Sequence, residues 1–558
     1  MRHVYLIPAG LLFFAWLSPL HVMPWLSWHN ELLAILAVLV GGAGALHASR
    51  TRPPETAAIA VPTLVALPLA LAAVAWTQWF SGRIVHAGSV WAITSYAFIA
   101  AAAAAGGHAA GRGPAPSKAL ATLAWTLVLA VLLQCWACFV QVFDVGRGSG
   151  LVGITDGGMR SGGNFSQPNQ AALLFVLGAV ATVYLASAKR LGLGVAALVL
   201  AMIAAGLATT QSRSGLLALS VLVVLLPLRR DLLGGRRAML AALAYWLLAV
   251  LLFWAWPELF ARYWSHAETA VNLTTSGRGA MWAQLWEAVQ MRPWLGWGVL
   301  QVAEAQNAVA DRFPRVMATT YAHNVLLDLA LWVGLPAMAV TVGVAAAWAW
   351  RRLRAVRSLD QCFCVAIALP LATQSMTEFP FAYMFFIVPV FFVLGLLDAQ
   401  VGRSAGWRLG RRPAIALLAG AVAMHAWAAV EYAAIEEDFR IARFEALRYG
   451  ATPGDYERPD VRLLTHLGAL LEVTRLEPRP DMSAQELARV EAMARLYPWG
   501  ATNFRYITAL ALNGRMDEAR RQLRVLRAVH GEKTYDGVLQ SLGELALRYP
   551  VLRELLQP

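Results

Sequence analysis

Three arginines occur in short motifs rich in serine, threonine or glycine, where a charged side chain could meet an anionic ligand. Arg213 lies beside Gln211 in the segment QSRSG, at a tight junction between two apolar stretches, and Arg278 directly follows TTSG. Arg160 lies in a glycine-rich segment, GGMRSGGN. Arginine stays charged, and its planar guanidinium fits phosphate through paired hydrogen bonds. The sequence therefore predicts a phosphate-bearing ligand, although ordinary solvation would explain each arginine taken alone.

The surroundings of each arginine favour a different interpretation of its role. An arginine at a membrane edge, as expected for Arg213, is costly unless its side chain reaches water or pairs with a ligand. The Ser/Thr run 274–276 is typical of a helix N-cap, which would put Arg278 at a helix start, where backbone N–H groups favour anions. Around Arg160, loop flexibility alone would account for the glycines.

Two titratable side chains could hold or move a proton near these arginines. His323 follows Tyr321 in the segment YAHN, where an apolar stretch begins, and imidazole accepts a proton near neutral pH. Glu378 lies between two short apolar segments and could pair with an arginine or position a hydroxyl group. The alternatives are a helix cap or structural donor for His323 and a simple ion pair for Glu378.

The composition requires most of the chain to lie in a membrane. Hydrophobic residues make up 59% of the 558 residues and charged residues 14%, against roughly 25% charged in a soluble domain. The net charge of +13 belongs to residues 1–434, because the polar tail 435–558 holds 18 basic and 18 acidic residues. A soluble enzyme, a disordered chain and a disulfide-stapled domain are excluded. Nucleic-acid binding is not expected, because the positive charge does not cluster on a polar domain.

The apolar stretches predict about thirteen transmembrane helices, since a span needs about 20 mostly apolar residues. Residues 1–20 look like a signal peptide, but no small-residue cleavage site follows, so they are expected to remain as the first span. The cysteine pair Cys135 and Cys138 falls within a span and is expected to pack rather than react. The expected spans are 4–22, 31–48, 57–80, 89–107, 119–143, 169–188, 192–210, 214–228, 238–256, 324–350, 361–375, 381–398 and 414–434.

Charge also predicts the orientation of the chain. Basic residues crowd alternate loops, for example Arg50, Lys118 and Arg408, and the positive-inside rule puts these loops in the cytoplasm. The N-terminus is then inside, whereas the long loop 257–323 and the tail are outside. The outer side of the membrane domain carries arginine and no lysine, which again favours a phosphate-bearing ligand there.

Missing motifs limit the chemistry. Residues 1–434 contain no GxxxxGK[ST] loop and no DxD pair, so neither ATP hydrolysis nor a metal-held nucleotide sugar is expected. No cofactor and no metal site are predicted. A transporter would show charges in mid-span and two similar halves, and no such repeat is found.

The order and spacing of the motifs resemble those of the O-antigen ligase superfamily of bacterial inner-membrane glycosyltransferases. The matching elements are Arg160 with GNF at 163–165 and PN at 168–169, SRSG at 212–215, SGR at 276–278 with Trp282, PWLGWG at 293–298, and HN at 323–324.

Other features are similar to the PglL/PilO-type protein O-oligosaccharyltransferases of that superfamily. They are HVMPW at 21–25 with Glu31, Gln78 with GRI at 82–84, and SMTEFPFAY at 375–383. Members often carry a histidine just before that serine; here the residue is Gln374, so no role of such a histidine is transferred. The resemblance covers roughly residues 1–445, and the tail fits only in kind.

The resemblance implies an all-α, polytopic, GT-C-like membrane domain at 1–434 and a periplasmic helical domain at 435–558, in the bacterial inner membrane. The implied reaction transfers a glycan from undecaprenyl pyrophosphate to a Ser or Thr hydroxyl of an acceptor protein, such as pilin, without a metal. Arg213 and Arg278 would bind the pyrophosphate, and His323 would act near the reacting centre. The residues expected to bind substrate are Arg160, Asn169, Gln211, Trp282, Tyr321 and Glu378.

The tail and the acceptor leave alternatives open. Residues 504–520 resemble one tetratricopeptide unit, and stacked units of this kind form peptide-binding surfaces, but a domain that merely covers the active site is the alternative. Three other functions remain: an O-antigen ligase with a lipid A core acceptor, a Wzy-like glycan polymerase, and a lipid or glycan transporter. The soluble outer domain and the motif at 378–380 favour a protein acceptor.

Overall fold

The three-dimensional structure is a computed structural model of the whole chain. The residues that it describes are 5–557, apart from 49, 51–57, 146–148, 155–158, 230, 233–234, 264–276, 314–315, 403–405, 448 and 450–451. The predicted N-cap run 274–276 and the glycines Gly157 and Gly158 lie outside the described residues.

The chain divides into two compact units, and both are discontinuous in sequence. The first unit comprises Met1–Ala70, Ser95–Asn272 and Val344–Ala426. The second unit comprises Leu71–Thr94, Leu273–Gly343 and Trp427–Pro558. The expected domain boundary near residue 434 falls inside a long helix, α16 (Arg411–Ala446), which contributes to both units.

Apolar helices dominate the described residues, which confirms the all-α, polytopic membrane fold. Within the described residues, nine helical segments are long and apolar enough to cross a membrane, and three shorter apolar helices accompany them. The long ones are α2 (Trp28–Ala48), Thr63–Phe80 with η2 (Thr63–Val65) and α3 (Ala66–Phe80), α4 (Ala87–Gly111), α5 (Pro116–Phe143), α6 (Pro168–Ser187), α7 (Leu193–Thr210), α9 (Gly235–Tyr263), α15 (Met384–Val401) and α16. The shorter ones are α1 (Leu6–Leu17), α8 (Arg213–Leu225), which η4 (Leu226–Arg229) extends, and α14 (Leu359–Gln374).

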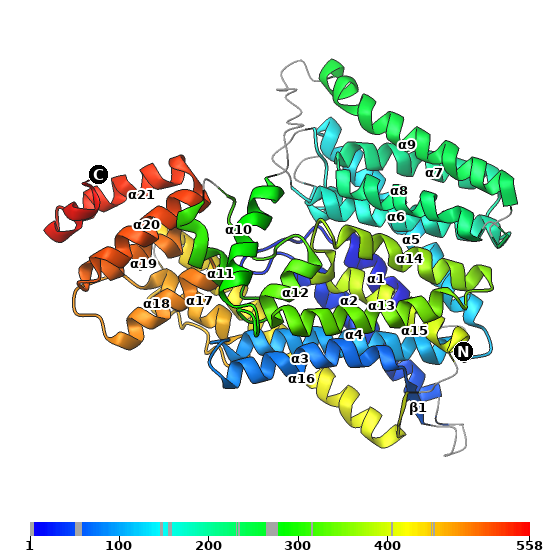
Figure 1. Cartoon of the computed structure of the whole chain (residues 1–558), viewed down its shortest axis with the longest axis horizontal. Coiled ribbons are helices and arrows are strands. Elements are labelled where there is room, and N and C mark those ends of the chain that lie inside the picture. The colour runs from blue at the N-terminus through cyan, green and yellow to red at the C-terminus, as the bar shows by residue number, and fades with distance from the viewer. Residues whose placement is uncertain are drawn as a thin grey trace. The chain divides into compact units, whose positions relative to one another are not determined.

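The core of the first unit lies between α5, α6, α7, α14 and α15, of which α6 and α15 are the most buried (Figure 1). Small and large apolar side chains alternate there, so that the helices approach closely and still fill the space. Cys135 and Cys138 are free and buried in α5. The interpretation of this cysteine pair as packing residues is therefore confirmed.

Two glycines allow α4 and α15 of the first unit to cross in direct contact. A Cβ atom on Gly107 would lie 1.8 Å from the carbonyl oxygen of Phe392, and one on Gly395 would lie 1.9 Å from that of Ala104. Any larger residue would force the two backbones apart. The crossing therefore needs glycine on both helices.

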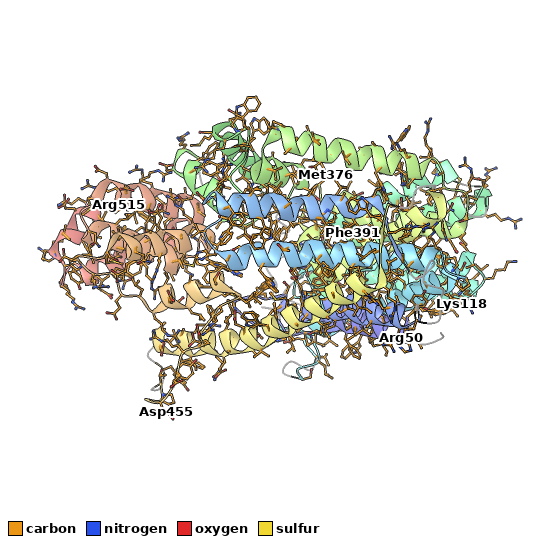
Figure 2. All side chains as sticks on the ribbon, turned by 90° about the horizontal axis from the view of Figure 1, so that it is seen from below. Arg50, Lys118, Met376, Phe391, Asp455 and Arg515 are labelled. Carbon is orange, nitrogen blue, oxygen red and sulfur yellow. The ribbon has the colours of Figure 1, made fainter. Side chains whose placement is uncertain are left out.

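Segments of the first unit that were predicted to be cytoplasmic lie together. The strands β1 (Ile59–Val61) and β2 (Trp407–Leu409) follow two different basic loops and pair antiparallel, with Ala60 opposite Arg408. Figure 2 shows Arg50 and Lys118 near the same end of this unit. The structure thus gathers these basic segments on one side, as the charge pattern predicted.

Acidic side chains hold the neighbouring helix ends together. Arg352 donates to Asp398 at 2.5 Å, and His108 lies 3.3 Å from the same carboxylate, which is buried. Asp360, at the start of α14, accepts a hydrogen bond from Ser117 at 2.5 Å. These few carboxylates therefore act as local partners for basic and polar groups on this side.

One expected span is not a single helix. The prediction of one span over 324–350 was wrong, because α12 (Val325–Val333) ends at Gly334 and α13 (Leu335–Leu353) starts directly after it. Gly334 has φ +82°, and a Cβ there would lie 2.3 Å from the Trp294 carbonyl oxygen. The Pro293 carbonyl oxygen accepts a hydrogen bond from Leu335 N–H at 2.7 Å. The segment 293–298 thus packs into the break and supplies a hydrogen-bond partner for the start of α13.

The described part of the expected loop 257–323 contains several helices. It continues α9 to Tyr263 and then holds α10 (Arg278–Met291), α11 (Val302–Val309) and η5 (Ala310–Arg312). In the second unit α17 (Thr465–Arg475) to α21 (Glu532–Leu545) follow one another side by side (Figure 1). The intervening helices are α18 (Ala484–Leu496), α19 (Gly500–Leu512) and α20 (Met516–His530), and η7 (Pro550–Leu555) ends the chain.

Candidate functional site

In the first unit, Arg213 lies at the expected tight junction between two helices. Helix α7 ends at Thr210, Gln211 turns the chain with φ +47°, and Ser212 caps α8 by accepting from Gly215 N–H at 3.2 Å. Arg213 is the first residue of α8 and is exposed, and within the described part of the chain it makes no hydrogen bond or ion pair. Its guanidinium is therefore available to an anion at a helix N-terminus.

Gln211 fixes this junction to a neighbouring helix. Its side-chain amide donates to the Phe253 carbonyl of α9 at 2.8 Å and to the Ala208 carbonyl at 2.9 Å. Both of its amide hydrogens thus point into the protein. The predicted role of Gln211 in substrate binding stays a prediction, with its carbonyl oxygen as the available group.

Arg160 is tied to the same helix end, since its Nε donates to the Thr210 carbonyl at 3.2 Å. The two following glycines are packed, and flexibility alone does not account for them. A Cβ on Gly162 would lie 2.3 Å from Gln167 N, and one on Gly163, where φ is +54°, would lie 2.4 Å from the Gln134 amide nitrogen. This tight turn, which includes η3 (Gly163–Phe165), holds the chain beside α5.

Asn169, Ser212 and Glu378 form a hydrogen-bonded chain across three helices of the first unit. Asn169 lies in the first turn of α6, which Gln167 caps. Its amide nitrogen donates to Glu378 Oε1 at 2.5 Å, and its amide oxygen accepts from Ser212 Oγ at 2.7 Å. Glu378 follows α14 and is 4% exposed. The structure therefore brings Asn169 and Glu378 together beside the residue that precedes Arg213.

Gln374 completes this group from α14. Its amide nitrogen donates to the Asn169 carbonyl at 2.8 Å and to Ser214 Oγ at 3.2 Å. Its amide oxygen is buried and has no hydrogen-bond partner among the described residues. Gln374 and Tyr383 also line a small cavity of ≈ 10 Å³ with Asn169 and Glu378. The sequence identified Gln374 only as a departure from the family pattern. Motif spacing alone does not show that α6, α8, α14 and α15 meet at this residue.

In the second unit, Arg278 begins α10 directly after Gly277, whose φ of +64° is the left-handed conformation that favours glycine. This confirms the expected position of Arg278 at a helix start. Trp282 lies one turn further on the same face, and its indole N–H donates to the Ala322 carbonyl at 2.8 Å. The start of α10 is thereby joined to the residue just before His323.

His323 itself is held in an uncommon backbone conformation. Its φ is +53°, which costs about 1 kcal/mol or more for a residue other than glycine. Asn324 follows as the cap of α12 and accepts from Leu326 and Leu327, while buried Asp328 accepts from Ala322 N–H at 2.8 Å. The alternative of His323 as the cap is excluded, because Asn324 caps the helix.

Tyr321 and Gln78 support the segment around His323. The Tyr321 ring meets Trp332 of α12 edge to face, with centroids 6.3 Å apart. Gln78 braces the same helix, because its amide donates to the Trp332 carbonyl at 2.8 Å and accepts from Val299 N–H at 2.9 Å. The conformation around His323 is thus determined by contacts on both sides.

The two groups offer complementary chemistry. The first unit presents an exposed arginine at a helix N-terminus next to a buried amide–carboxylate network. The second unit presents an arginine at a helix N-terminus and a partly buried imidazole. Arginine and helix N-termini stabilise developing negative charge, and imidazole can accept a proton from a hydroxyl group.

Two sequence families match the chain. The family described as "O-Antigen ligase" matches residues 197–342, which include Arg213, Arg278 and His323. The family described as "Virulence factor membrane-bound polymerase, C-terminal" matches residues 362–541, which include Glu378 and most of the C-terminal helices.

Two characterised relatives come from Acinetobacter baylyi. The chain is 24% identical to its "General O-oligosaccharyltransferase" over 96% of this chain and 94% of that protein. It is 24% identical to the "ComP-specific O-oligosaccharyltransferase" over 50% of this chain and 51% of that protein. The first similarity extends through the tail, where the sequence motifs indicated agreement only in kind.

The fold and these similarities define a multi-pass membrane enzyme related to the O-antigen ligases. Within that group the similarities support an O-linked oligosaccharyltransferase of the PglL type, as the sequence motifs indicated.

Proposed function

We propose that the protein transfers a glycan en bloc from undecaprenyl pyrophosphate to Ser or Thr hydroxyls of periplasmic proteins, such as pilins, without a metal. The observation that carries this proposal is that Arg213 and Arg278 each begin a helix, α8 and α10. At each helix start, the guanidinium and the backbone N–H groups of the first turn can bind one anion. A polyprenyl-linked diphosphate is such an anion.

The reaction is a displacement at the anomeric carbon of the glycan. The acceptor oxygen forms the new bond to that carbon, and the bond between the carbon and the diphosphate oxygen breaks, so the diphosphate leaves with the electron pair. His323 takes the hydroxyl proton, while Arg213 and Arg278 stabilise the charge that develops on the leaving group. A single displacement inverts the anomeric centre.

The remaining predicted residues have supporting roles in this proposal. Arg160, Asn169, Gln211 and Glu378 bind the donor, and Tyr321 and Trp282 contact the substrate near His323. The N-terminus is cytoplasmic, and the reaction takes place on the periplasmic side of the inner membrane.

The residue roles are tested by transfer assays in membranes. Arg278→Ala and His323→Ala should each abolish glycan transfer and leave the amount of protein in the membrane unchanged. Arg262→Ala is the matched control, because Arg262 is exposed and paired only with Glu258 at 3.2 Å among the described residues. Unchanged transfer in either test variant would contradict the proposed roles.

The acceptor class needs a separate experiment. The similarity to an O-antigen ligase family keeps lipid A core as a second candidate acceptor. The protein is co-expressed with a glycan-lipid pathway and candidate pilins, and the pilins are analysed by mass spectrometry. Glycan on pilin is expected, whereas glycan that is found only on lipopolysaccharide would identify a ligase.

A further inference from the structure

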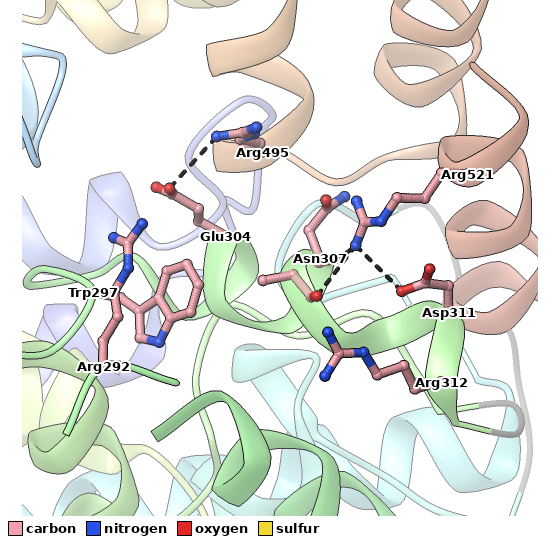
Figure 3. Close-up of a pocket in the computed structure, with 9 residues that line it drawn as sticks. Arg292, Trp297, Glu304, Asn307, Asp311, Arg312, Arg495 and Arg521 are labelled. Atoms are coloured by element: carbon pink, nitrogen blue, oxygen red, sulfur yellow. Dashed lines mark hydrogen bonds and ion pairs between the residues drawn. The ribbon is translucent and has the colours of Figure 1, made fainter. Parts of the chain in front are cut away.

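The second unit contains a cavity that none of the proposed catalytic residues lines. Its volume is ≈ 360 Å³, and it lies between the segment that contains α11 and two helices of the tail, α18 and α20 (Figure 3). The lining residues are Arg292, Trp297, Glu304, Asn307, Ala308, Asp311, Arg312, Arg495 and Arg521.

The walls of the cavity are firmly joined. Ala310 of η5 packs against Val525 and Val529 of α20, and Val316 N–H donates to the Ala528 carbonyl at 2.9 Å. Arg521 donates to the Asn307 carbonyl at 3.0 Å, so that α20 and α11 hold the cavity open between them. The cavity is therefore formed by elements of this unit that are packed and hydrogen-bonded to one another.

The cavity has an excess of positive charge, with four arginines and two carboxylates. Arg495 lies 3.6 Å from Glu304, and Arg521 lies 3.2 Å from Asp311. Both distances exceed the roughly 2.7–2.9 Å of a strong charged hydrogen bond. These two pairs are loose, so an incoming carboxylate can share the guanidinium groups, although Arg495 also forms an ion pair with Glu491 and Arg312 lies 2.6 Å from Glu287.

Arg292 is the arginine best placed for a ligand. Its guanidinium stacks over the Trp297 ring at 4.0 Å and points into the cavity (Figure 3), and no carboxylate of the described residues forms an ion pair with it. The Trp297 indole is 4% exposed and donates to the Ala288 carbonyl at 2.8 Å. The tryptophan therefore orients Arg292 and offers no free face for stacking on a sugar.

The carboxyl group of Glu304 competes only weakly with a ligand for these arginines. Burial raises the pKa of its carboxyl group, although Arg495 and Arg292 oppose the shift. The charged form of Glu304 is therefore less favourable here than in water. The same two cavity carboxylates repel a densely charged diphosphate, which favours single carboxylates as ligands.

We propose that this cavity binds an acidic segment of the acceptor polypeptide, with side-chain carboxylates between Arg292 and Arg495. The inference rests on the proposed function, because it assumes a protein acceptor. It assigns the recognition of that acceptor to the joint between the tail and the segment 292–312.

Binding is measured directly, without catalysis. The full-length protein in detergent micelles is titrated with a fluorescein-labelled peptide in which aspartates flank a central serine, and with its asparagine counterpart. Fluorescence anisotropy should show about tenfold tighter binding of the aspartate peptide at low salt, as expected for one or two charged hydrogen bonds. Arg292→Ala and Arg495→Ala should each remove most of this preference, and Arg495→Lys should keep part of it.

Arg527→Ala is the matched control, because Arg527 lies on the same helix as Arg521 but pairs with Glu532 at 2.9 Å outside the cavity. This variant should keep the preference. Equal binding of the two peptides, or a preference that survives in Arg292→Ala and Arg495→Ala, would overturn the proposal. Displacement of the peptide by glucuronate at lower concentration than by N-acetylaspartate amide would overturn it as well.

The two proposals fail separately. If the aspartate peptide binds through Arg292 but neither pilin nor peptide is ever glycosylated, the cavity assignment holds and the transfer to protein is wrong. If pilin is glycosylated but peptide binding ignores the cavity arginines, the transfer stands and the cavity assignment is wrong.

Discussion

At the scale of single residues, His323 combines a side chain that can accept a proton with an uncommon backbone conformation. The positive φ of His323 is maintained by its neighbours, since Trp282 binds the preceding carbonyl and Asn324 caps the following helix. Backbone outliers that are over-determined by their surroundings tend to occur at functional sites. We therefore propose that Trp282 positions the imidazole through the Ala322 carbonyl.

Trp282→Phe should lower kcat for glycan transfer by roughly tenfold and leave KM for the donor nearly unchanged, because phenylalanine fills the space but cannot donate to Ala322. Steady-state transfer assays measure both constants. Trp286→Phe on the same helix is the control, since Trp286 is 47% exposed. A fall in kcat that is equal in the two variants would refute the positioning role.

The pair of Asn169 and Glu378 permits a swap experiment. Asn169→Asp puts a second carboxylate at 2.5 Å from a buried one and should lower thermal stability and transfer together. The double variant Asn169→Asp with Glu378→Gln restores one donor and one acceptor, so it should recover most of the lost stability. Thermal unfolding in detergent measures the recovery, and additive losses would argue against the pair.

At the scale of elements, close helix crossings and a broken helix determine the positions of the sites. The crossing of α4 and α15 depends on glycine, and the break between α12 and α13 depends on Gly334 and the segment packed against it. Both features arise from backbone contacts between distant segments. A hydropathy pattern predicts neither feature, because it does not distinguish a glycine at a helix crossing from any other glycine in a transmembrane span.

Gly395→Ala should destabilise the protein by about 1–3 kcal/mol, because its methyl group meets the Ala104 carbonyl. The thermal midpoint in detergent, followed by size-exclusion chromatography, measures the loss. Gly10→Ala in α1 is the control, since a Cβ there meets no atom within 4 Å. Equal midpoints for the two variants would disprove the close crossing.

His466 at the start of α17 predicts a pH dependence of stability. Burial, with a smaller contribution from His86, lowers its pKa from 6.5 to about 3. The unfolded chain therefore binds more protons between these values, and the free energy of unfolding falls as pH falls below about 6.5. The thermal midpoint should decrease from about pH 7 to about pH 5, and His466→Gln should show a shallower decrease. Parallel curves would rule out this histidine as the cause.

At the scale of the whole molecule, the tail is not an appendage to the rest of the chain. It shares one compact unit with the segments 71–94 and 273–343, and α20 packs on η5 within that unit. Deleting 445–558 would therefore expose apolar surface of the segment that carries His323. Point substitutions in the tail are the better test of acceptor binding, because they leave this packing intact.

The orientation of the chain can be tested with two single cysteines in a background without reactive native thiols. Lys118→Cys should resist a membrane-impermeant maleimide in intact cells, whereas Arg515→Cys should react once the outer membrane is permeabilised. The reason is that Lys118 belongs to a basic loop and Arg515 to the neutral tail. Labelling of Lys118→Cys but not of Arg515→Cys would show that the orientation is the opposite of the predicted one.

The sequence by itself determined the membrane class, the positions of most of the apolar helices and the resemblance to O-antigen ligases. Long apolar runs have one stable form in lipid, and basic loops bias their orientation, so these properties are local. The motifs around Arg213, Arg278 and His323 could be found for the same reason, since helix starts and caps are encoded within a few residues.

Only the tertiary structure decided which residues meet. The contacts of Asn169 with Glu378, of Trp282 with Ala322 and of Arg521 with Asn307 join segments far apart in the chain. Such contacts depend on helix packing and on carbonyl groups exposed at breaks, which no local pattern encodes. The arginine cavity and the break at Gly334 could therefore not be predicted from the sequence.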